Sequence, residues 1–180
     1  MAEKGWLILN YTIPKEPSRV RVSVWRKLKK YGSVNIGQSM WLLPLSAKHI
    51  DIFTEISDEI IQNSGDAYIL KGNFVRENGS DNIVELFNKA RDEEYKELLE
   101  KCEDFFREID KETERQNFSF AEVEENEEEY NKLIVWYRKI AERDFFSASL
   151  RIVSEQELEK CKNTLEDFSN WVYELNSENN

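Results

Sequence analysis

The run Trp6-Leu7-Ile8-Leu9-Asn10-Tyr11-Thr12-Ile13 begins the part of the chain that decides the fold. Aromatic and branched apolar residues dominate it and Pro14 ends it, which predicts a first β-strand. Ser18 is then a candidate N-cap for a helix, and Gly32 is placed to end that helix in a left-handed conformation. The apolar residues of this helix recur at steps of three and four, which predicts one buried face. They are Val20, Val24, Leu28 and Tyr31.

The next residues predict a hairpin, a second helix and a fourth strand. Two short strands over 34–36 and 40–43 flank Gly37-Gln38, and the second helix begins at Ser46 and ends near Asn63-Ser64-Gly65. The fourth strand is predicted over 67–70. The order β-α-β-β-α-β predicts an α+β domain of the ferredoxin-like type over residues 1–78, with an antiparallel sheet covered on one face by two helices.

Residues 79–180 predict a helical extension packed on this domain, made of about three amphipathic helices. The segment Glu122–Glu129 has six Glu in eight positions, which is typical of a solvated helix start. The capping box Ser154-Glu-Gln-Glu157 is expected to open the last helix.

Cysteine use and hydropathy restrict the class of protein. Cys102 and Cys161 both fall on apolar stripes of predicted helices, so we expect buried, reduced thiols. With one histidine, His49, the chain lacks the usual ligand set of a structural zinc site. No apolar stretch approaches the roughly 18 residues that would span a bilayer. We therefore expect a cytoplasmic protein without metal or cofactor.

Charge is strongly segregated along the chain. The whole sequence of 180 residues carries a formal charge of −11. The first fifty residues have nine Lys and Arg against two acids, which gives +7, and the remaining residues carry −18. A surface of one sign attracts ligands of the opposite sign, so the basic end is the candidate site for a polyanion.

The positive charge of this end is concentrated on the first helix. On a helical wheel, Ser23 and three cations lie opposite the apolar face, with Lys27 and Lys29 at the flanks and Trp25 beside them. The three cations are Arg19, Arg26 and Lys30. They form a row about 16 Å long, which can follow several backbone phosphates. The sequence contains no nucleophile motif, Gly-rich phosphate loop or metal-ligand spacing, so we expect no catalysis.

Five segments in order resemble the N-terminal domain of ChrB-type chromate-resistance regulators. They are Trp6-Leu-Ile-Leu…Ile13-Pro14, Val24-Trp-Arg-Lys-Leu-Lys-Lys-Tyr-Gly32, Met40-Trp-Leu-Leu-Pro44, Glu85-Leu-Phe-Asn-Lys-Ala-Arg-Asp92 and Arg143-Asp-Phe-Phe146. The resemblance runs to about Trp171 and implies a DNA-binding transcriptional regulator of a chromate-efflux operon. Its suspected DNA contacts correspond to Arg19, Arg21, Arg26 and Lys27. Full-length members continue into a C-terminal effector domain that this sequence lacks, so chromate sensing is not carried over.

The first 75 or so residues also resemble the small ferredoxin-fold subunit of the CRISPR adaptation complex and the middle domain of phenylacetate-pathway repressors. That likeness implies a possible homodimer through the sheet. Some nuclease relatives have a metal-binding Asp after a Tyr at the end of the first strand, where this chain has Tyr11-Thr12. A neutral hydroxyl is a poor Mg²⁺ ligand, which disfavours a nuclease.

Three hypotheses follow from the sequence. The first is a DNA-binding regulator whose partner is double-stranded DNA, contacted through the basic first helix. Its predicted contact residues are Arg19, Arg21, Arg26, Lys27 and Lys30. The second is a non-enzymatic interaction or adaptor module in which the same cations dock on an acidic surface, including the chain's own Glu-rich helices. The third, least favoured, is a metal-dependent nuclease relic.

Overall fold

The computed structural model describes residues 5–76 and 78–177. It divides into two compact units, Met1–Ala90 and Arg91–Asn180. The division falls inside a long helix, whereas the predicted boundary at residue 78 falls in the loop before that helix. The first turns of the helix are therefore part of the compact unit that contains the sheet.

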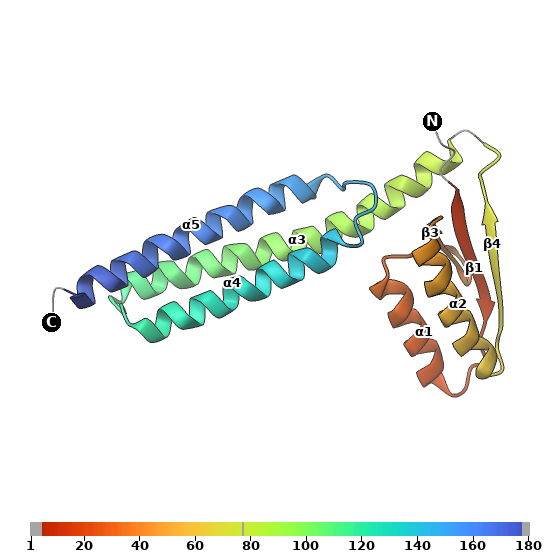
Figure 1. Cartoon of the computed structure of the whole chain (residues 1–180), viewed down its shortest axis with the longest axis horizontal. Helices are drawn as coiled ribbons and strands as arrows, with labels where there is room; N and C mark the ends of the chain where they lie inside the picture. The colour runs from red at the N-terminus through yellow and green to blue at the C-terminus, as the bar shows by residue number, and fades with distance from the viewer. Residues whose placement is uncertain (1–4, 77, 178–180) are drawn as a thin grey trace. The chain divides into compact units, whose positions relative to one another are not determined.

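The first unit has the predicted β-α-β-β-α-β order (Figure 1). Its elements are β1 (Trp6–Thr12), α1 (Ser18–Lys30), β2 (Val34–Gly37), β3 (Met40–Pro44), α2 (Ala47–Gln62) and β4 (Asp66–Gly72). The four strands form one antiparallel sheet in the order β2-β3-β1-β4, and α1 and α2 lie side by side on one of its faces. The predicted α+β, ferredoxin-like class is confirmed.

Strand register separates the two faces of the sheet. In β1, Leu7 pairs with Leu43 and Leu9 with Trp41, and all four side chains are buried. Residues one step away along a strand point to the opposite face. There Ile8 pairs with Leu70, whose side chain is 51% exposed. The alternation fixes which face takes the helices, because a register slip of one residue would expose the buried leucines.

The beginning of α3 (Gly79–Glu114) belongs to the core of the first unit. The Trp6 ring stacks on Phe87 of α3 at a centroid distance of 5.8 Å and meets Phe74 edge-on at 6.2 Å. The Trp6 indole N–H also donates a hydrogen bond to the Ser80 hydroxyl at 3.2 Å. These contacts attach the first turns of α3 to the start of β1.

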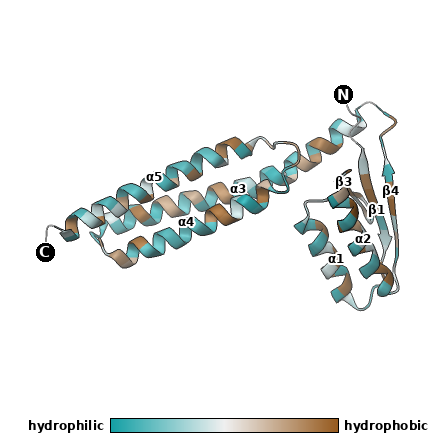
Figure 2. Cartoon of the chain, in the orientation of Figure 1, coloured by the Kyte–Doolittle hydropathy of each residue, from teal (hydrophilic) through white to brown (hydrophobic). Residues whose placement is uncertain are grey.

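The second unit is a three-helix arrangement of α3 with α4 (Phe120–Ala141) and α5 (Leu150–Ser177). Figure 2 shows hydrophobic and hydrophilic residues alternating along these helices, as expected when each one buries a stripe. Cys102 of α3 and Cys161 of α5 are fully buried within the apolar core of this unit. Both are free thiols, and their burial confirms that part of the prediction.

Two aspartates connect the loop before α5 to α3. The carboxylate of Asp92 on α3 accepts hydrogen bonds from the Leu150 N–H at 2.8 Å and from the Ser149 hydroxyl at 2.9 Å. Asp144 is buried and accepts one from the Ala148 N–H and one from the Tyr95 hydroxyl. These bonds supply partners for donors at the start of α5, which the helix itself cannot satisfy.

The predicted capping box at Ser154 is wrong. Helix α5 begins at Leu150, so Ser154 lies inside the helix, and its hydroxyl is buried without a hydrogen-bond partner among the described residues. The observed cap comes from Asp92, which is 58 positions away in sequence from Leu150. A local motif search cannot detect such a cap.

We predict that Asp92→Ala destabilises the protein by about 1 kcal/mol, the usual effect of losing a helix N-terminal cap. Ser154→Ala is the matched control and should be neutral or slightly stabilising, because it removes a buried hydroxyl that has no partner. Urea unfolding followed by far-UV circular dichroism measures both. Equal destabilisation by the two substitutions would contradict the assignment of the cap to Asp92.

Candidate nucleic-acid interface

Helix α1 is held by one apolar stripe and ends at a glycine. Val20, Val24 and Leu28 are buried at four-residue steps, as predicted. Gly32 has a φ of 75° and its N–H donates to the Lys29 carbonyl, while the Ser33 N–H donates to the Leu28 carbonyl. This pair of bonds is the Schellman motif, which favours glycine because of the positive φ. The predicted Ser18 cap is not made, since Pro17 takes the N-cap position without a side-chain hydrogen bond.

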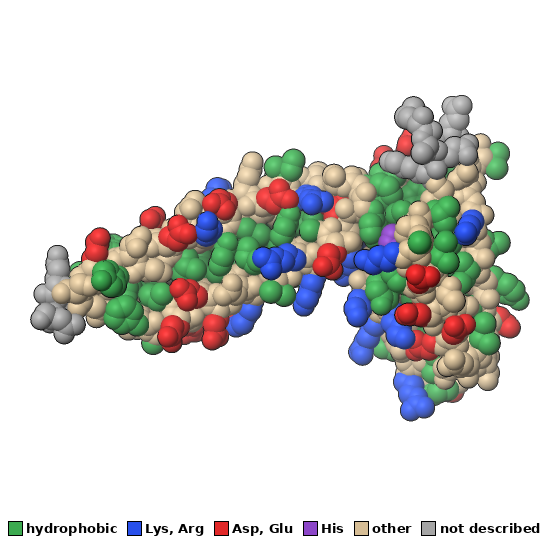
Figure 3. Space-filling model, viewed as in Figure 1, with side chains coloured by type: hydrophobic (Ala, Val, Ile, Leu, Met, Phe, Trp, Pro, Cys, Tyr) green, Lys and Arg blue, Asp and Glu red, His purple; other side chains and the backbone are tan. Residues whose placement is uncertain are grey.

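The predicted cations of α1 are exposed. Arg19, Arg21, Arg26 and Lys30 all have exposed side chains. Within the described part of the first unit, no carboxylate forms an ion pair with any of the three arginines. In Figure 3 the Lys and Arg side chains of this unit gather over α1, beside the carboxylates of α2. We call Arg19, Arg26 and Lys30, which the wheel places on one side of the helix, the basic ridge.

Lys27 differs from the ridge because it has a partner. Its ammonium contacts the Glu59 carboxylate of α2 at 2.6 Å, and the Ser23 hydroxyl donates to the same carboxylate at 2.7 Å. Partial burial raises the pKa of Glu59, but the hydrogen bonds from Lys27 and Ser23 outweigh this effect and leave the pKa below its ordinary value. Ser23 therefore faces α2, whereas the wheel had placed it with the ridge.

Two further lysines contact aromatic rings. The Lys29 ammonium lies 6.0 Å from the centre of the Trp41 ring, and that of Lys30 lies 5.6 Å from Tyr31. Such contacts attract a cation toward the ring without neutralising its charge. Both ammonium groups therefore keep their positive charge at the surface.

A shallow depression of about 350 Å³ lies on the first unit, lined by residues of β1 and α1. Its lining residues are Tyr11, Ser18, Arg21, Val22 and Trp25. We call it the Trp25 notch. Trp25 is 50% exposed and Val22 is 43% exposed, so large apolar surfaces remain in water here. Sequence reasoning identified Arg21 and Trp25 but missed Tyr11, since only the fold brings the end of β1 beside α1.

The end of β1 also meets a carboxylate. The Thr12 hydroxyl donates to Asp66 of β4 at 3.3 Å. Among residues 5–76 and 78–177, no group of three or more His, Cys, Asp or Glu side chains is placed to hold a metal ion.

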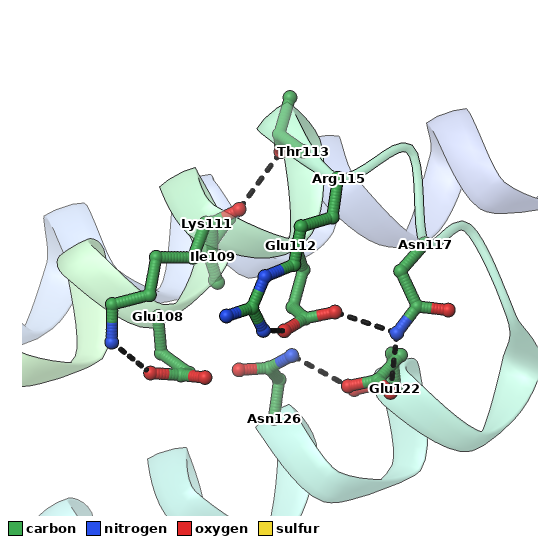
Figure 4. A network of polar contacts seen from close by, with 9 residues as sticks. All are labelled: Glu108, Ile109, Lys111, Glu112, Thr113, Arg115, Asn117, Glu122 and Asn126. Carbon is green, nitrogen blue, oxygen red and sulfur yellow. Dashed lines mark hydrogen bonds and ion pairs between the residues drawn. The ribbon is translucent and has the colours of Figure 1, made fainter.

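The Glu-rich start of α4 lines a groove of about 440 Å³ in the second unit. Figure 4 shows its polar network. Glu112 is buried and contacts Arg115 at 3.3 Å and Asn117 at 2.6 Å. Asn117 also donates to Glu122, and the Asn126 amide donates to the Glu122 carbonyl. These bonds give Glu112 and Glu122 structural partners, and we place the candidate site on α1.

The fold and the site together define the class of protein. It is an α+β protein that has a ferredoxin-like sheet unit, a three-helix unit and a cationic first helix. The sequence model of the family described as "Protein ChrB, N-terminal" matches residues 21–179. The chain belongs to this family, which confirms the resemblance to chromate-resistance regulators. No curated protein and no solved structure matches the chain. Over the part of the chain that the structure describes, no helix has the length and apolar character needed to cross a bilayer.

We predict that Glu59→Gln lowers the stability at neutral pH. The folded-state pKa of Glu59 is below its unfolded value, so its contribution is present above the unfolded pKa and is lost as the pH falls through the folded one. Lys27 is about half exposed, so solvent screening limits the loss to about 1 kcal/mol or less.

Thermal unfolding across a pH series measures this effect. The melting temperatures of wild type and Glu59→Gln should differ at neutral pH and converge in acid. Asp58→Asn is the control and should follow the wild type, because Asp58 is an exposed neighbour on the same helix that forms no ion pair with the described part of the chain. A difference between Glu59→Gln and wild type that grows in acid would contradict the interpretation.

Proposed function

We propose that this chain is a DNA-binding, regulator-like protein that acts without catalysis and contacts the phosphates of duplex DNA through the basic ridge of α1. The observation that carries the proposal is the exposure of Arg19, Arg21 and Arg26 without a carboxylate partner in the described first unit. Their charges therefore remain available to a polyanion.

Because the chain as a whole is acidic, DNA binding requires one region of its surface to be locally basic. A net charge of −11 repels nucleic acid as a whole, so binding requires a surface on which cations are concentrated. The fold supplies one by burying the apolar stripe of α1 and turning its other side to solvent. Each phosphate neutralised by this side releases counterions, which makes the affinity fall steeply with salt.

The cations have unequal roles in this proposal. Arg19 and Arg26 present guanidinium groups, which can bind a phosphate through two hydrogen bonds, and Lys30 adds a point charge. Lys27 contributes less because Glu59 neutralises much of its charge. Arg21 lies in the Trp25 notch, on a different side of α1 from the ridge.

The family to which the chain belongs is the basis for proposing which process it regulates. We propose that the natural ligand is promoter DNA of a chromate-resistance operon. Phosphate contacts alone do not select a sequence, so any preference for such a promoter must come from base contacts or DNA shape.

We predict that Arg19→Glu/Arg26→Glu abolishes most of the binding to a short labelled duplex at low salt. Fluorescence anisotropy at several ionic strengths gives the slope of log affinity against log salt. Loss of two phosphate contacts should reduce that slope by about 2. Thermal stability should be nearly unchanged, because neither arginine forms an ion pair or side-chain hydrogen bond with another described residue.

Lys132→Glu/Lys160→Glu is the matched control. It changes the net charge by the same amount at two exposed sites of the second unit. It should bind the duplex nearly as the wild type does. The proposal fails if the ridge variant binds the duplex unchanged, or if the two double variants lose affinity equally.

We also propose that the chain forms a homodimer through the exposed, β4 part of the sheet face opposite α1 and α2. On edge strand β4, Tyr68 is 63% exposed and Leu70 is 51% exposed. They are two residues apart and therefore lie on one face, beside the partly buried Ile8. Adjacent exposed apolar side chains of this kind mark interaction surfaces.

We predict that Tyr68→Glu/Leu70→Glu gives a monomer where the wild type sediments as a dimer. Sedimentation velocity at a series of concentrations is the measurement. Val75→Glu is the control, because Val75 is a fully exposed apolar residue in the loop after β4, outside the proposed interface, and should leave the dimer intact. A monomeric wild type at all accessible concentrations would exclude the dimer.

A further inference from the structure

Two aromatic side chains are among the residues that line the Trp25 notch. Tyr11 and Trp25 line it from two different elements, β1 and α1. The exposed half of the Trp25 side chain is an apolar surface that the fold leaves in water. A ligand that covered it would gain the free energy of burying that surface. The lining therefore favours an aromatic ligand over a purely ionic one.

The tyrosine side of the notch is held in place. The Tyr11 backbone N–H donates to the Ser39 carbonyl at 3.2 Å, and Tyr11 pairs with Ala67 of β4. The sheet therefore fixes the backbone of Tyr11, which reduces the entropy lost when a ligand is bound.

The polar groups of the notch select the chemistry of the ligand. Arg21 offers N–H donors and a positive charge, and the Ser18 hydroxyl can both donate and accept. No acidic residue is among the described residues that line the notch. An aromatic ring that carries hydrogen-bond acceptors and is attached to an anion fits this lining, and a nucleobase attached to its phosphate has that composition.

The notch and the basic ridge are parts of the same helix. Ser18 precedes Arg19 and Trp25 precedes Arg26, and one residue step turns about 100° around the helix, so the notch and the ridge lie on neighbouring sides of α1. We propose that the notch takes one unstacked base of the DNA whose phosphates lie on the ridge, with stacking on Trp25 and a hydrogen bond from Arg21. This inference rests on the proposed DNA binding and specifies the form of DNA that is preferred.

The expected ligand is a duplex that contains one extrahelical base. Taking a paired base out of the stack is unfavourable, whereas a base that is already unpaired avoids most of that loss. Stacking of one base on an aromatic side chain typically changes affinity by about 10-fold or more. The wild type should therefore bind a duplex with one bulged thymine about 10-fold more tightly than the fully paired duplex.

The experiment compares three labelled duplexes by fluorescence anisotropy: fully paired, with one bulged thymine, and with an abasic residue at the bulge. The abasic duplex has the same bend without the base and should lose the preference. Trp25→Ala should also lose it while keeping the salt dependence, and Trp25→Phe should keep most of it. Trp171→Ala, which alters a tryptophan of similar exposure in the second unit, should behave as the wild type does.

The outcomes separate this inference from the proposed function. Salt-dependent binding that is equal for all three duplexes overturns the base site and leaves DNA binding intact. No binding of any duplex overturns both. An unchanged preference in Trp25→Ala, or equal binding of abasic and bulged duplexes, also overturns the base site. If polyglutamate displaces the bulged duplex from the wild type and itself binds through Trp25, the notch is a docking site for acidic protein segments and the inference fails.

Discussion

Burial of Val20, Val24 and Leu28 is the constraint on which the rest of the site depends. These three side chains pack α1 onto the sheet unit and so fix the rotation of the helix about its own axis. Because the arginines occupy the other angular positions of the same short sequence, that rotation also decides which of them face solvent. The apolar and basic residues of α1 are thus one pattern, and a change in the packing face would redirect every charge on the helix.

Electrostatics within each unit is consistent with this arrangement. On the second unit many acids have nearby cations three or four positions along their own helix, as in the pairs Lys101–Asp104, Glu129–Lys132 and Glu157–Lys160. Such exposed pairs stabilise helices only slightly, but they keep local charge balanced. Helix α1 itself, Ser18–Lys30, contains no acidic residue. One carboxylate, Glu59, approaches from α2, and it pairs with Lys27 rather than with the arginines.

The order and type of the elements in the sheet unit could be predicted because they depend on local signals: the β-rich run at Trp6, the period of the α1 stripe and the glycine at position 32. The exposure of the basic ridge followed from the same period. The sequence could not predict contacts between distant segments, such as the Asp92 cap of α5, the Glu59–Lys27 pair or the place of Tyr11 in the notch. The capping box at Ser154 failed for that reason, since a distant carboxylate made an earlier start of the helix possible.

The segments that carry the family resemblance therefore differ in what they contribute. Asp92 and Asp144 lie in two of them, and their hydrogen bonds hold the loop before α5 to α3, so these positions are explained by architecture. The segment that contains α1 has a different character, because Arg26 is exposed and half of the Trp25 side chain faces water, which a packing role does not account for. The family match begins at Arg21, inside this helix. Fold alone does not determine function. In the first unit, α1 is the element whose exposed residues are not explained by packing.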